Sequence, residues 1–190
     1  PADWRWSDRQ IEASRQAALG CLDLRDGLWV YGYGSLMWDP GVHFAEIRLA
    51  ALDGHQRRFN FQTSMARGTV EQPALMLSLE ARAGCCQGLA IHLAAERAEA
   101  ELEILWRREM IRGAYRPVML PVATPQGDIS ALVFTSNPSH PEYVGELPLP
   151  DTAAIIARAA GVMGTNRDYL EQMARQLAAL EIHDDSVAQL

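Results

Sequence analysis

The chain of 190 residues is long enough for one compact domain, and its apolar fraction of 48% and charged fraction of 22% are ordinary for a globular protein. All 17 basic residues are arginines. Without lysine the chain cannot form a Schiff base, anchor pyridoxal phosphate or build the usual lysine-containing phosphate loop. The 24 acidic residues give a net charge of −7, which disfavours nucleic acids and anionic membranes as partners and favours a small molecule or a protein.

The cysteines indicate a reducing compartment. Cys21, Cys85 and Cys86 have neither the even number of a disulfide framework nor the spacing of a metal site, so we expect a cytoplasmic protein without a bound metal. No apolar stretch approaches the roughly 20 residues that span a bilayer. Residues 1–4 also lack the basic and apolar regions of a signal peptide, so we expect no membrane partner.

The amphipathic pattern from Ser7 or Asp8 to Leu24 predicts a helix, which we interpret as an N-terminal arm within residues 1–27. A β-prone run, 28–31, then enters a glycine-rich turn. Further strands are predicted at 57–63, 75–79, 87–93, 116–122 and 129–135, and helices at 96–112, 151–160 and 166–180. Strands gathered in the middle, with helices inserted and appended, predict an α+β domain over 28–190 built on a small mixed sheet or barrel.

A carboxylate on the apolar face of the helix predicted at 96–112 is the first candidate for chemistry. Steps of three and four residues trace an apolar stripe whose next position is Glu109; the stripe comprises Ala98, Leu102, Leu105 and Trp106. Burial and the negative end of the helix dipole both raise a carboxyl pKa, so Glu109 is a candidate for proton transfer near neutral pH. The alternative is a structural ion pair with Arg107, Arg108 or Arg116.

The turn after the first predicted strand is the second candidate. Gly32 and Gly34, separated by Tyr33, let the backbone turn tightly and present successive N–H groups to an anion. The pattern lacks the third glycine of a dinucleotide-binding fingerprint and the lysine of a phosphate loop. It predicts either a structural tight turn or a loop that binds a carboxylate.

Taken together, these segments resemble the ChaC-like γ-glutamylcyclotransferases, which act on glutathione, and the resemblance covers about residues 28–185. The motifs that carry it, in chain order, are Tyr33-Gly34-Ser35-Leu36-Met37-Trp38, Gly54-His55-Gln56-Arg57-Arg58-Phe59, Arg67-Gly68-Thr69 with Gln72-Pro73, Cys86-Gln87-Gly88-Leu89-Ala90, Trp106-Arg107-Arg108-Glu109-Met110, Gly113-Ala114-Tyr115-Arg116-Pro117, Ser136-Asn137-Pro138-Ser139-His140-Pro141 with Tyr143, and Gly164-Thr165-Asn166-Arg167-Asp168-Tyr169-Leu170.

The resemblance implies a small closed mixed sheet flanked by helices, with the active site at one mouth. It implies that Glu109 is the catalytic general base and acid, and that the turn Gly32, Tyr33, Gly34, Ser35, Leu36 and Met37 binds substrate. The implied reaction needs no cofactor: the α-amine of the γ-glutamyl group of glutathione attacks its own γ-carbonyl, giving 5-oxoproline and cysteinylglycine. Tyr115 and Tyr169 are further candidates for substrate contacts, with aromatic packing as the alternative for both.

Three other functions stay open at this point. The chain could cyclise other γ-glutamyl amines or dipeptides, or it could bind γ-glutamyl compounds as a regulatory module without turning them over. It could also be an acyl hydrolase with Ser35 as nucleophile, although no histidine has a sequence-evident place as its base. The sequence does not determine the oligomeric state.

Overall fold

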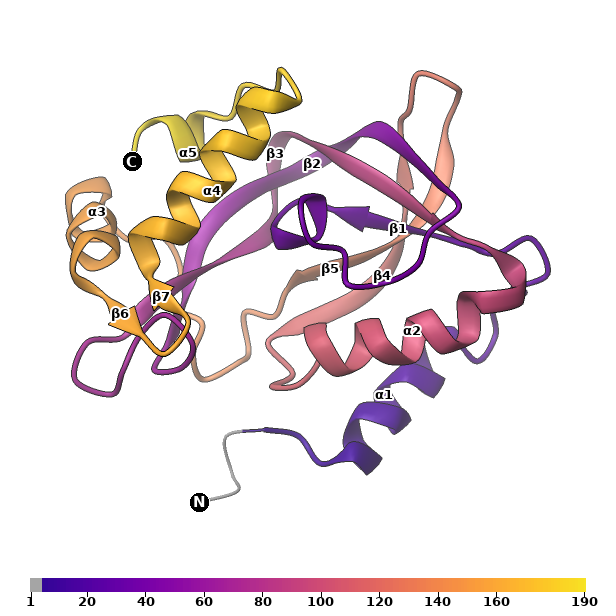
Figure 1. Cartoon of the computed structure of the whole chain (residues 1–190), viewed down its shortest axis with the longest axis horizontal. Helices are drawn as coiled ribbons and strands as arrows, with labels where there is room; N and C mark the ends of the chain where they lie inside the picture. The colour runs from indigo at the N-terminus through magenta and orange to yellow at the C-terminus, as the bar shows by residue number, and fades with distance from the viewer. Residues whose placement is uncertain (1–4) are drawn as a thin grey trace. The chain divides into compact units, whose positions relative to one another are not determined.

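The computed structural model describes residues 5–190, so residues 1–4, on which the signal-peptide expectation depends, lie outside the described part (Figure 1). The elements in chain order are α1 (Asp8–Leu19), β1 (Leu28–Gly32), η2 (Ser35–Met37), β2 (Glu46–Thr63), β3 (Ala74–Leu93), α2 (Ala95–Glu109), β4 (Tyr115–Val122), β5 (Ile129–Ser136), α3 (Leu149–Arg158), β6 (Ala160–Gly161), β7 (Gly164–Thr165), α4 (Asn166–Ala179) and α5 (Asp185–Ala188). Among the described helices, none is both long and apolar enough to cross a bilayer.

The chain forms two compact units, and the long strands β2 and β3 run through both. The first unit contains the residues up to Asp53 together with Gln87–Asn137. The second contains Gly54–Cys86 and Pro138–Leu190.

A five-stranded mixed sheet has the strand order β2-β3-β1-β5-β4. β1 pairs antiparallel with β3 and parallel with β5, and β4 pairs antiparallel with β5. The edge strand β2 and the end of β4 meet through Ala51 and Ala123, whose N–H groups each donate to the other's carbonyl at 2.9 Å. The predicted α+β class with a small mixed sheet flanked by helices is therefore confirmed. The sheet is curled, and the bridge between Ala51 and Ala123 joins its two edges.

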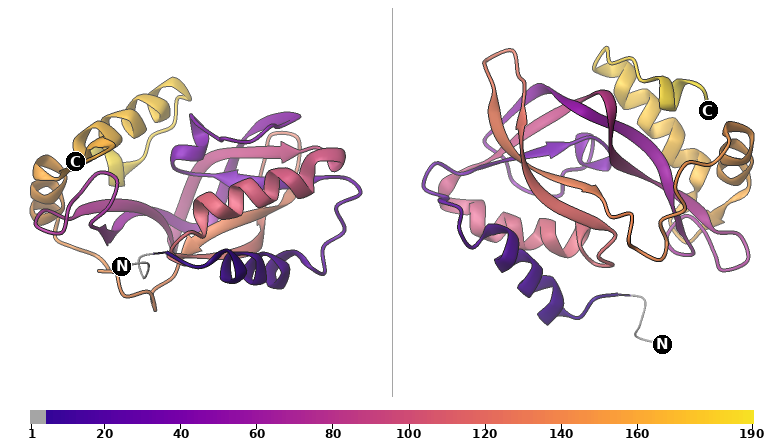
Figure 2. Two further views of the ribbon diagram at one scale, coloured as in Figure 1. Left: turned by 60° about the horizontal axis from the view of Figure 1, so that its bottom comes forward. Right: turned by 180° about the vertical axis from the view of Figure 1, so that it is seen from behind.

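In the first unit α1 packs beside α2, as both views of Figure 2 show. The Ser7 side chain accepts a hydrogen bond from the Gln10 N–H in a capping box, so the predicted N-terminal cap is confirmed at Ser7. The helix ends at Leu19 rather than near Leu24. The indole N–H of the fully buried Trp106 donates to Ser14 Oγ at 2.8 Å, so α1 provides a polar partner for the core of α2.

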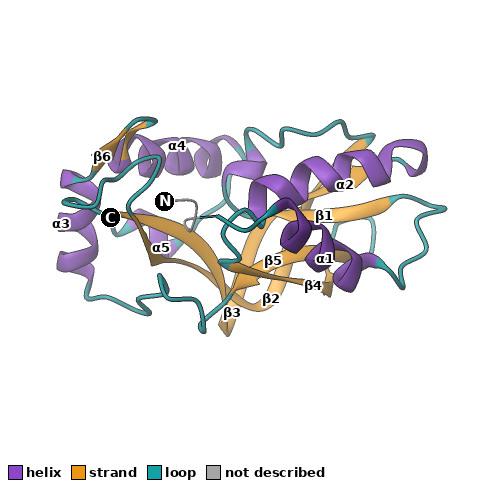
Figure 3. Ribbon diagram, turned by 90° about the horizontal axis from the view of Figure 1, so that it is seen from below, coloured by secondary structure: helices purple, strands orange, loops and turns teal. Residues whose placement is uncertain are grey.

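The second unit joins the far parts of β2 and β3 to α3, α4, α5 and the short β6–β7 hairpin (Figure 3). Asn166, at the start of α4, is 1% exposed; its Oδ1 accepts from the Leu75 N–H at 2.8 Å and its Nδ2 donates to the Leu75 carbonyl at 2.9 Å. The fully buried Arg57 pairs with Asp184 at 2.7 Å, which fixes the segment before α5 on β2. Both contacts give hydrogen-bond partners to buried polar side chains.

Candidate functional site

Glu109 is the last residue of α2, where the apolar stripe of that helix predicts a carboxylate turned toward the core. The stripe is confirmed: its four members Ala98, Leu102, Leu105 and Trp106 are at most 1% exposed. The side chain of Glu109 is 15% exposed. Burial raises the pKa of Glu109 to about 6, and the positive charge of Arg108 partly offsets that rise.

The ion pair that the sequence left open is formed with Arg108, whose Nε lies 3.2 Å from Glu109 Oε1. The other two candidate partners are engaged elsewhere: Arg107 pairs with Glu103 at 2.7 Å, and Arg116 Nε donates to Asn137 Oδ1 at 3.0 Å. An ion pair alone would lower the carboxyl pKa, but the pKa of Glu109 is raised. Burial therefore has a larger effect on the pKa of Glu109 than the ion pair with Arg108 has.

The glycine turn leaves β1 at Gly32 and continues into the single 3-10 turn η2. A side chain at Gly32 would place its Cβ 3.2 Å from Leu36 Cβ, so glycine allows the turn to fold back on itself. The N–H of Met37 donates to the Gly34 carbonyl at 2.9 Å. The N–H groups at the start of such a turn, those of Ser35 and Leu36, have no partner within it.

The tyrosine of this turn is fixed by the sheet. Tyr33 is 7% exposed, and its hydroxyl donates to the Phe134 carbonyl at 2.7 Å. Leu36 and Met37 are also buried, whereas Ser35 is half-buried. Ser35 is therefore the residue of the turn that is most open to solvent.

Arg108 connects the turn to Glu109. Its Nη2 donates to Ser35 Oγ at 2.8 Å and its Nη1 donates to the Asp39 carbonyl at 2.6 Å, while its Nε pairs with the Glu109 carboxylate. One guanidinium thus holds both ends of the predicted site. The sequence predicts Arg108 only as a possible ion-pair partner of Glu109. Its contact with Ser35 joins residues 73 positions apart, and local sequence patterns do not reveal such contacts.

The contact with Arg108 also bears on the acyl-hydrolase alternative. A serine nucleophile needs a neighbouring group that can accept its proton. The polar side chain bonded to Ser35 Oγ is a guanidinium, which donates hydrogen bonds and cannot accept a proton. The geometry therefore argues against Ser35 as a nucleophile.

The two predicted tyrosines lie in different units. Tyr115 is the first residue of β4, is half-buried and pairs with Ser136 of β5 in the same unit as Glu109. Tyr169 lies on α4 in the other unit, where its ring meets Phe59 edge-on with centroids 6.3 Å apart. The guanidinium of Arg67 lies 5.6 Å from the centre of the same ring.

A second glutamate of α2, Glu101, is more deeply buried than Glu109, and the sequence reasoning missed it. Glu101 is 2% exposed, accepts from the His43 N–H at 3.0 Å and pairs with Arg97 at 3.2 Å. Glu101 precedes Leu105 of the apolar stripe by four residues, so helical periodicity places it on the buried side of α2. This spacing could have identified Glu101 from the sequence. Because its carboxylate is fully engaged by these partners, we assign it to holding the segment around His43.

A crystal structure of a yeast gamma-glutamylcyclotransferase specific to glutathione superposes with a TM-score of 0.78 at 21% identity, over 86% of this chain and 93% of that one. The chain therefore has the fold of that γ-glutamylcyclotransferase.

Sequence comparison identifies the family. The family model of ChaC-like proteins matches residues 28–190. The glutathione-specific gamma-glutamylcyclotransferase of Escherichia coli strain K12 is 39% identical over 186 residues, covering 97% of this chain and 80% of the relative. The glutathione-specific gamma-glutamylcyclotransferase 1 of Mus musculus is 32% identical over 164 residues, covering 83% and 74%. The chain belongs to the ChaC-like family.

Proposed function

We propose that this chain is a glutathione-specific γ-glutamylcyclotransferase that converts glutathione to 5-oxoproline and cysteinylglycine, with Glu109 as the proton-transfer group. The names of its relatives in Escherichia coli and mouse support the activity. The observation that carries the assignment of Glu109 is its buried carboxylate, with a pKa of about 6, joined through Arg108 to the turn that contains Ser35.

In the proposed reaction the α-amine nitrogen of the γ-glutamyl group bonds to its own γ-carbonyl carbon and closes a five-membered lactam. The bond from that carbon to the cysteine nitrogen breaks. Glu109 takes the proton that the attacking amine loses and delivers one to the leaving nitrogen. With a pKa of about 6 the carboxyl is roughly nine-tenths ionised at pH 7, so it can start as a base and then serve as an acid.

The turn from Gly32 to Met37 would hold the α-carboxylate of the substrate. The N–H groups of Ser35 and Leu36 support this assignment because an anion can accept from both. The charge of Arg108, which donates to Ser35 Oγ, favours a carboxylate at the same place. Since Met37 uses its N–H within the turn, we assign Met37 a supporting role beneath the substrate.

Tyr115 and Tyr169 remain proposed substrate contacts. Substitution of each by Phe removes the hydroxyl and keeps the ring. A rise in KM for glutathione at an unchanged melting temperature supports a substrate contact, whereas unchanged kinetics assigns that tyrosine to packing.

The first experiment incubates the purified protein with glutathione and measures cysteinylglycine and 5-oxoproline. We expect turnover by the wild type and its loss in Glu109→Gln. Glu103→Gln, an exposed residue on the same helix, and Glu101→Gln, a buried one, are the matched controls and should retain turnover. Turnover in Glu109→Gln would refute the role of Glu109, and no turnover by the wild type would refute the substrate.

Two parallel measurements separate the alternatives. Faster turnover of γ-glutamyl-alanine than of glutathione would assign the chain to other γ-glutamyl compounds. A stable complex with intact glutathione would instead indicate a binding module.

We also propose that the protein works in the cytoplasm and that residues 1–27 form an arm on a domain of residues 28–190. The thiols of Cys21 and Cys85 are exposed and take part in no disulfide, which supports a reducing compartment. The packing of α1 on α2 supports the arm. Cell fractionation tests the location, and expression of residues 28–190 alone tests the domain.

A further inference from the structure

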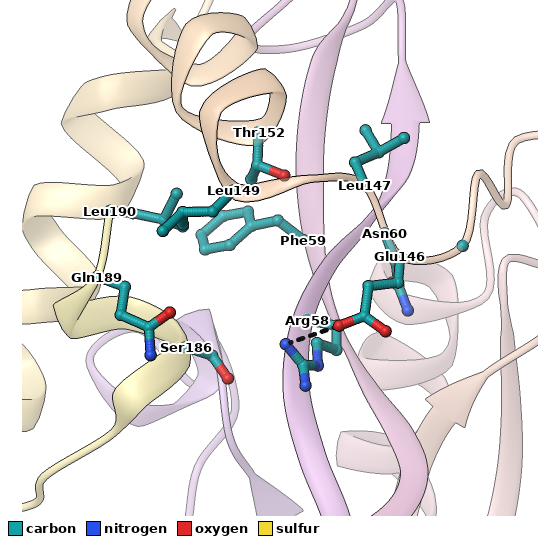
Figure 4. Close-up of a pocket in the computed structure, with 11 residues that line it drawn as sticks. Arg58, Phe59, Asn60, Glu146, Leu147, Leu149, Thr152, Ser186, Gln189 and Leu190 are labelled. Atoms are coloured by element: carbon teal, nitrogen blue, oxygen red, sulfur yellow. Dashed lines mark ion pairs between the residues drawn. The ribbon is translucent and has the colours of Figure 1, made fainter.

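A cavity of about 140 Å³ in the second unit is lined by charged, polar and apolar side chains, which include Arg58, Glu146, Thr152, Gln189 and Leu190 (Figure 4). Arg58 pairs with Glu146 at 3.6 Å, as the dashed line in the figure marks. Because this lining does not favour one chemical class of ligand over another, we assign the cavity no ligand. The N-terminal arm, by contrast, makes contacts that bear on the proposed active site.

The arm contacts the connection between α2 and β4, which consists of residues 110–114. The backbone N–H of Trp6 donates to the Ile111 carbonyl at 2.8 Å. The indole of Trp6 lies against Gly113, where an added Cβ would come within 2.1 Å of Trp6 Cζ2. Glycine is therefore favoured at this position both by the indole and by its positive φ of 69°. Trp6 thus holds the connection at two points.

Asn137, the residue after β5, holds the same connection from the sheet. Its Nδ2 donates to the Gly113 carbonyl at 3.2 Å, and its backbone N–H donates to the Ala114 carbonyl at 3.1 Å. Its Oδ1 accepts from Arg116 Nε at 3.0 Å, which ties Asn137 to β4. The connection is therefore held by two residues that are far apart in the sequence, one from the arm and one from the sheet.

The connection joins two residues of the proposed site. It follows Glu109 directly, and Tyr115 follows it directly. Met110, its first residue, donates its N–H to the Trp106 carbonyl at 2.8 Å and so closes the last turn of α2. A shift of the connection would therefore move both flanking side chains, and a misplacement of about 1 Å can lower a rate about 100-fold.

We propose that Trp6 is a positioning residue of the proposed cyclotransferase, holding residues 110–114 so that Glu109 and Tyr115 keep their places. The inference rests on the proposed function. Trp6 lies before residues 28–190, which the ChaC-like family model matches, so the arm supports the site from outside the matched domain.

Loss of this support should shift the pH profile in a definite direction. Burial raises the pKa of Glu109 to about 6, and Arg108 is the charged group that acts on this carboxyl among the described residues. Removal of the Trp6 indole leaves the Arg108 charge in place but loosens the end of α2, so water reaches the carboxyl more easily. The pKa of Glu109 should then fall toward the ordinary value of 4.5.

The test measures kcat/KM for glutathione from pH 4 to 9 with the full chain, at a temperature at which every variant is folded. Trp6→Ala removes the indole and keeps the backbone N–H. We expect kcat/KM at pH 8 to fall by about 5- to 100-fold. The midpoint of the acid limb should move from near pH 6 toward 4.5.

The matched control is Arg15→Ala, which removes a different contact between the arm and α2. Arg15 pairs with Glu99, roughly three helical turns before Glu109. This variant should change kcat/KM by less than about twofold and leave the midpoint in place, because sites this far apart act independently.

A second variant disturbs the contact from the other side. The Cβ of Gly113→Ala overlaps the Trp6 indole, so we expect the same loss of kcat/KM and the same direction of the midpoint. Gly54→Ala is its control: Gly54 has a similar φ of 71°, but an added Cβ meets no atom within 4 Å. This pair tests the contact even if Trp6→Ala fails to fold.

The outcomes separate this inference from the proposed function. An active wild type with unchanged kcat/KM or an unmoved midpoint in Trp6→Ala would overturn the role of Trp6 alone. Equal losses in Trp6→Ala and Arg15→Ala, or in the two glycine variants, would do the same. A wild type without turnover would refute the proposed function and the role of Trp6 together.

Discussion

Substitution of Arg108 by Gln should move the pH dependence of the proposed reaction. The charge of Arg108, with its Nε 3.2 Å from Glu109 Oε1, lowers a carboxyl pKa that burial has raised to about 6. Two unit charges about 4 Å apart attract by roughly 4 kcal/mol at an effective dielectric constant of about 20. Solvent reduces this figure, because the Arg108 and Glu109 side chains are 29% and 15% exposed.

An opposite charge at this range shifts a carboxyl pKa by about 1–3 units, and the partial exposure places the expected shift in the lower half of that range. The acid limb of kcat/KM should therefore lie near pH 6 in the wild type and move up by about 1–2 pH units in Arg108→Gln. At pH 7 the fraction of ionised Glu109 then falls about 2- to 10-fold. At pH 9 Glu109 is largely ionised in both proteins, so the part of the activity loss that comes from its protonation disappears.

The assay is kcat/KM for glutathione from pH 5 to 9, with the midpoint of the acid limb and the plateau fitted separately. Arg108→Lys is the matched control, because it keeps the charge but loses the planar set of donors that reaches Ser35 and Asp39. We expect Lys to leave the midpoint in place and to lower the plateau. An Arg108→Gln midpoint that stays at the wild-type pH, or moves down, would refute the electrostatic reasoning.

Three further substitutions test stability. Glu109→Gln should raise the free energy of unfolding at pH 7 by on the order of 2 kcal/mol. The folded pKa of about 6 lies above the ordinary 4.5, so ionisation of Glu109 opposes folding. This cost is absent below about pH 4.5, grows as the pH rises to 6 and is fully present above pH 6. Ser14→Ala should cost about 1–3 kcal/mol because the buried Trp106 N–H loses its acceptor. Asn166→Ala should cost about 2–4 kcal/mol because both backbone groups of Leu75 lose their partners.

Urea denaturation measures all three effects, and exposed positions provide the controls. Glu103→Gln and Arg167→Ala each remove one exposed helical ion pair and should change the free energy by less than about 0.5 kcal/mol. A Glu109→Gln variant that is less stable than the wild type at pH 7 would contradict the raised pKa. Wild-type stability in Ser14→Ala or Asn166→Ala would show that the lost hydrogen bond is replaced.

The sequence predicts the position of Glu109 because helical periodicity depends only on local spacing. The buried stripe of α2 leads to Glu109, and its side chain is largely buried as expected. The predicted end of this helix at 112 was wrong, since α2 stops at Glu109 and a glycine with a positive φ of 69° follows at Gly113. The residue at which a helix ends depends on tertiary contacts, which the spacing of apolar residues in the sequence does not specify.

The strands were predicted where they are buried and missed where they are exposed. The predicted strands at 75–79 and 87–93 are two parts of β3, whose residues 81–85 between them are exposed. Likewise β2 begins at Glu46 rather than near 57, and several of its first residues are exposed. Backbone pairing continues through these stretches, but without burial on one face there is no alternating pattern to read.

The coupling between the turn and Glu109 follows from the geometry of a single side chain. The Nη atoms of Arg108 donate to Ser35 in the turn and to the Asp39 carbonyl just after it, and its Nε faces Glu109. Without the guanidinium, Glu109 would lose the charge that lowers its pKa and would be less ionised at pH 7. A well-positioned turn and an ionised Glu109 are thus expected together, because the same group that orients the turn keeps the pKa of the buried carboxyl close to the working pH.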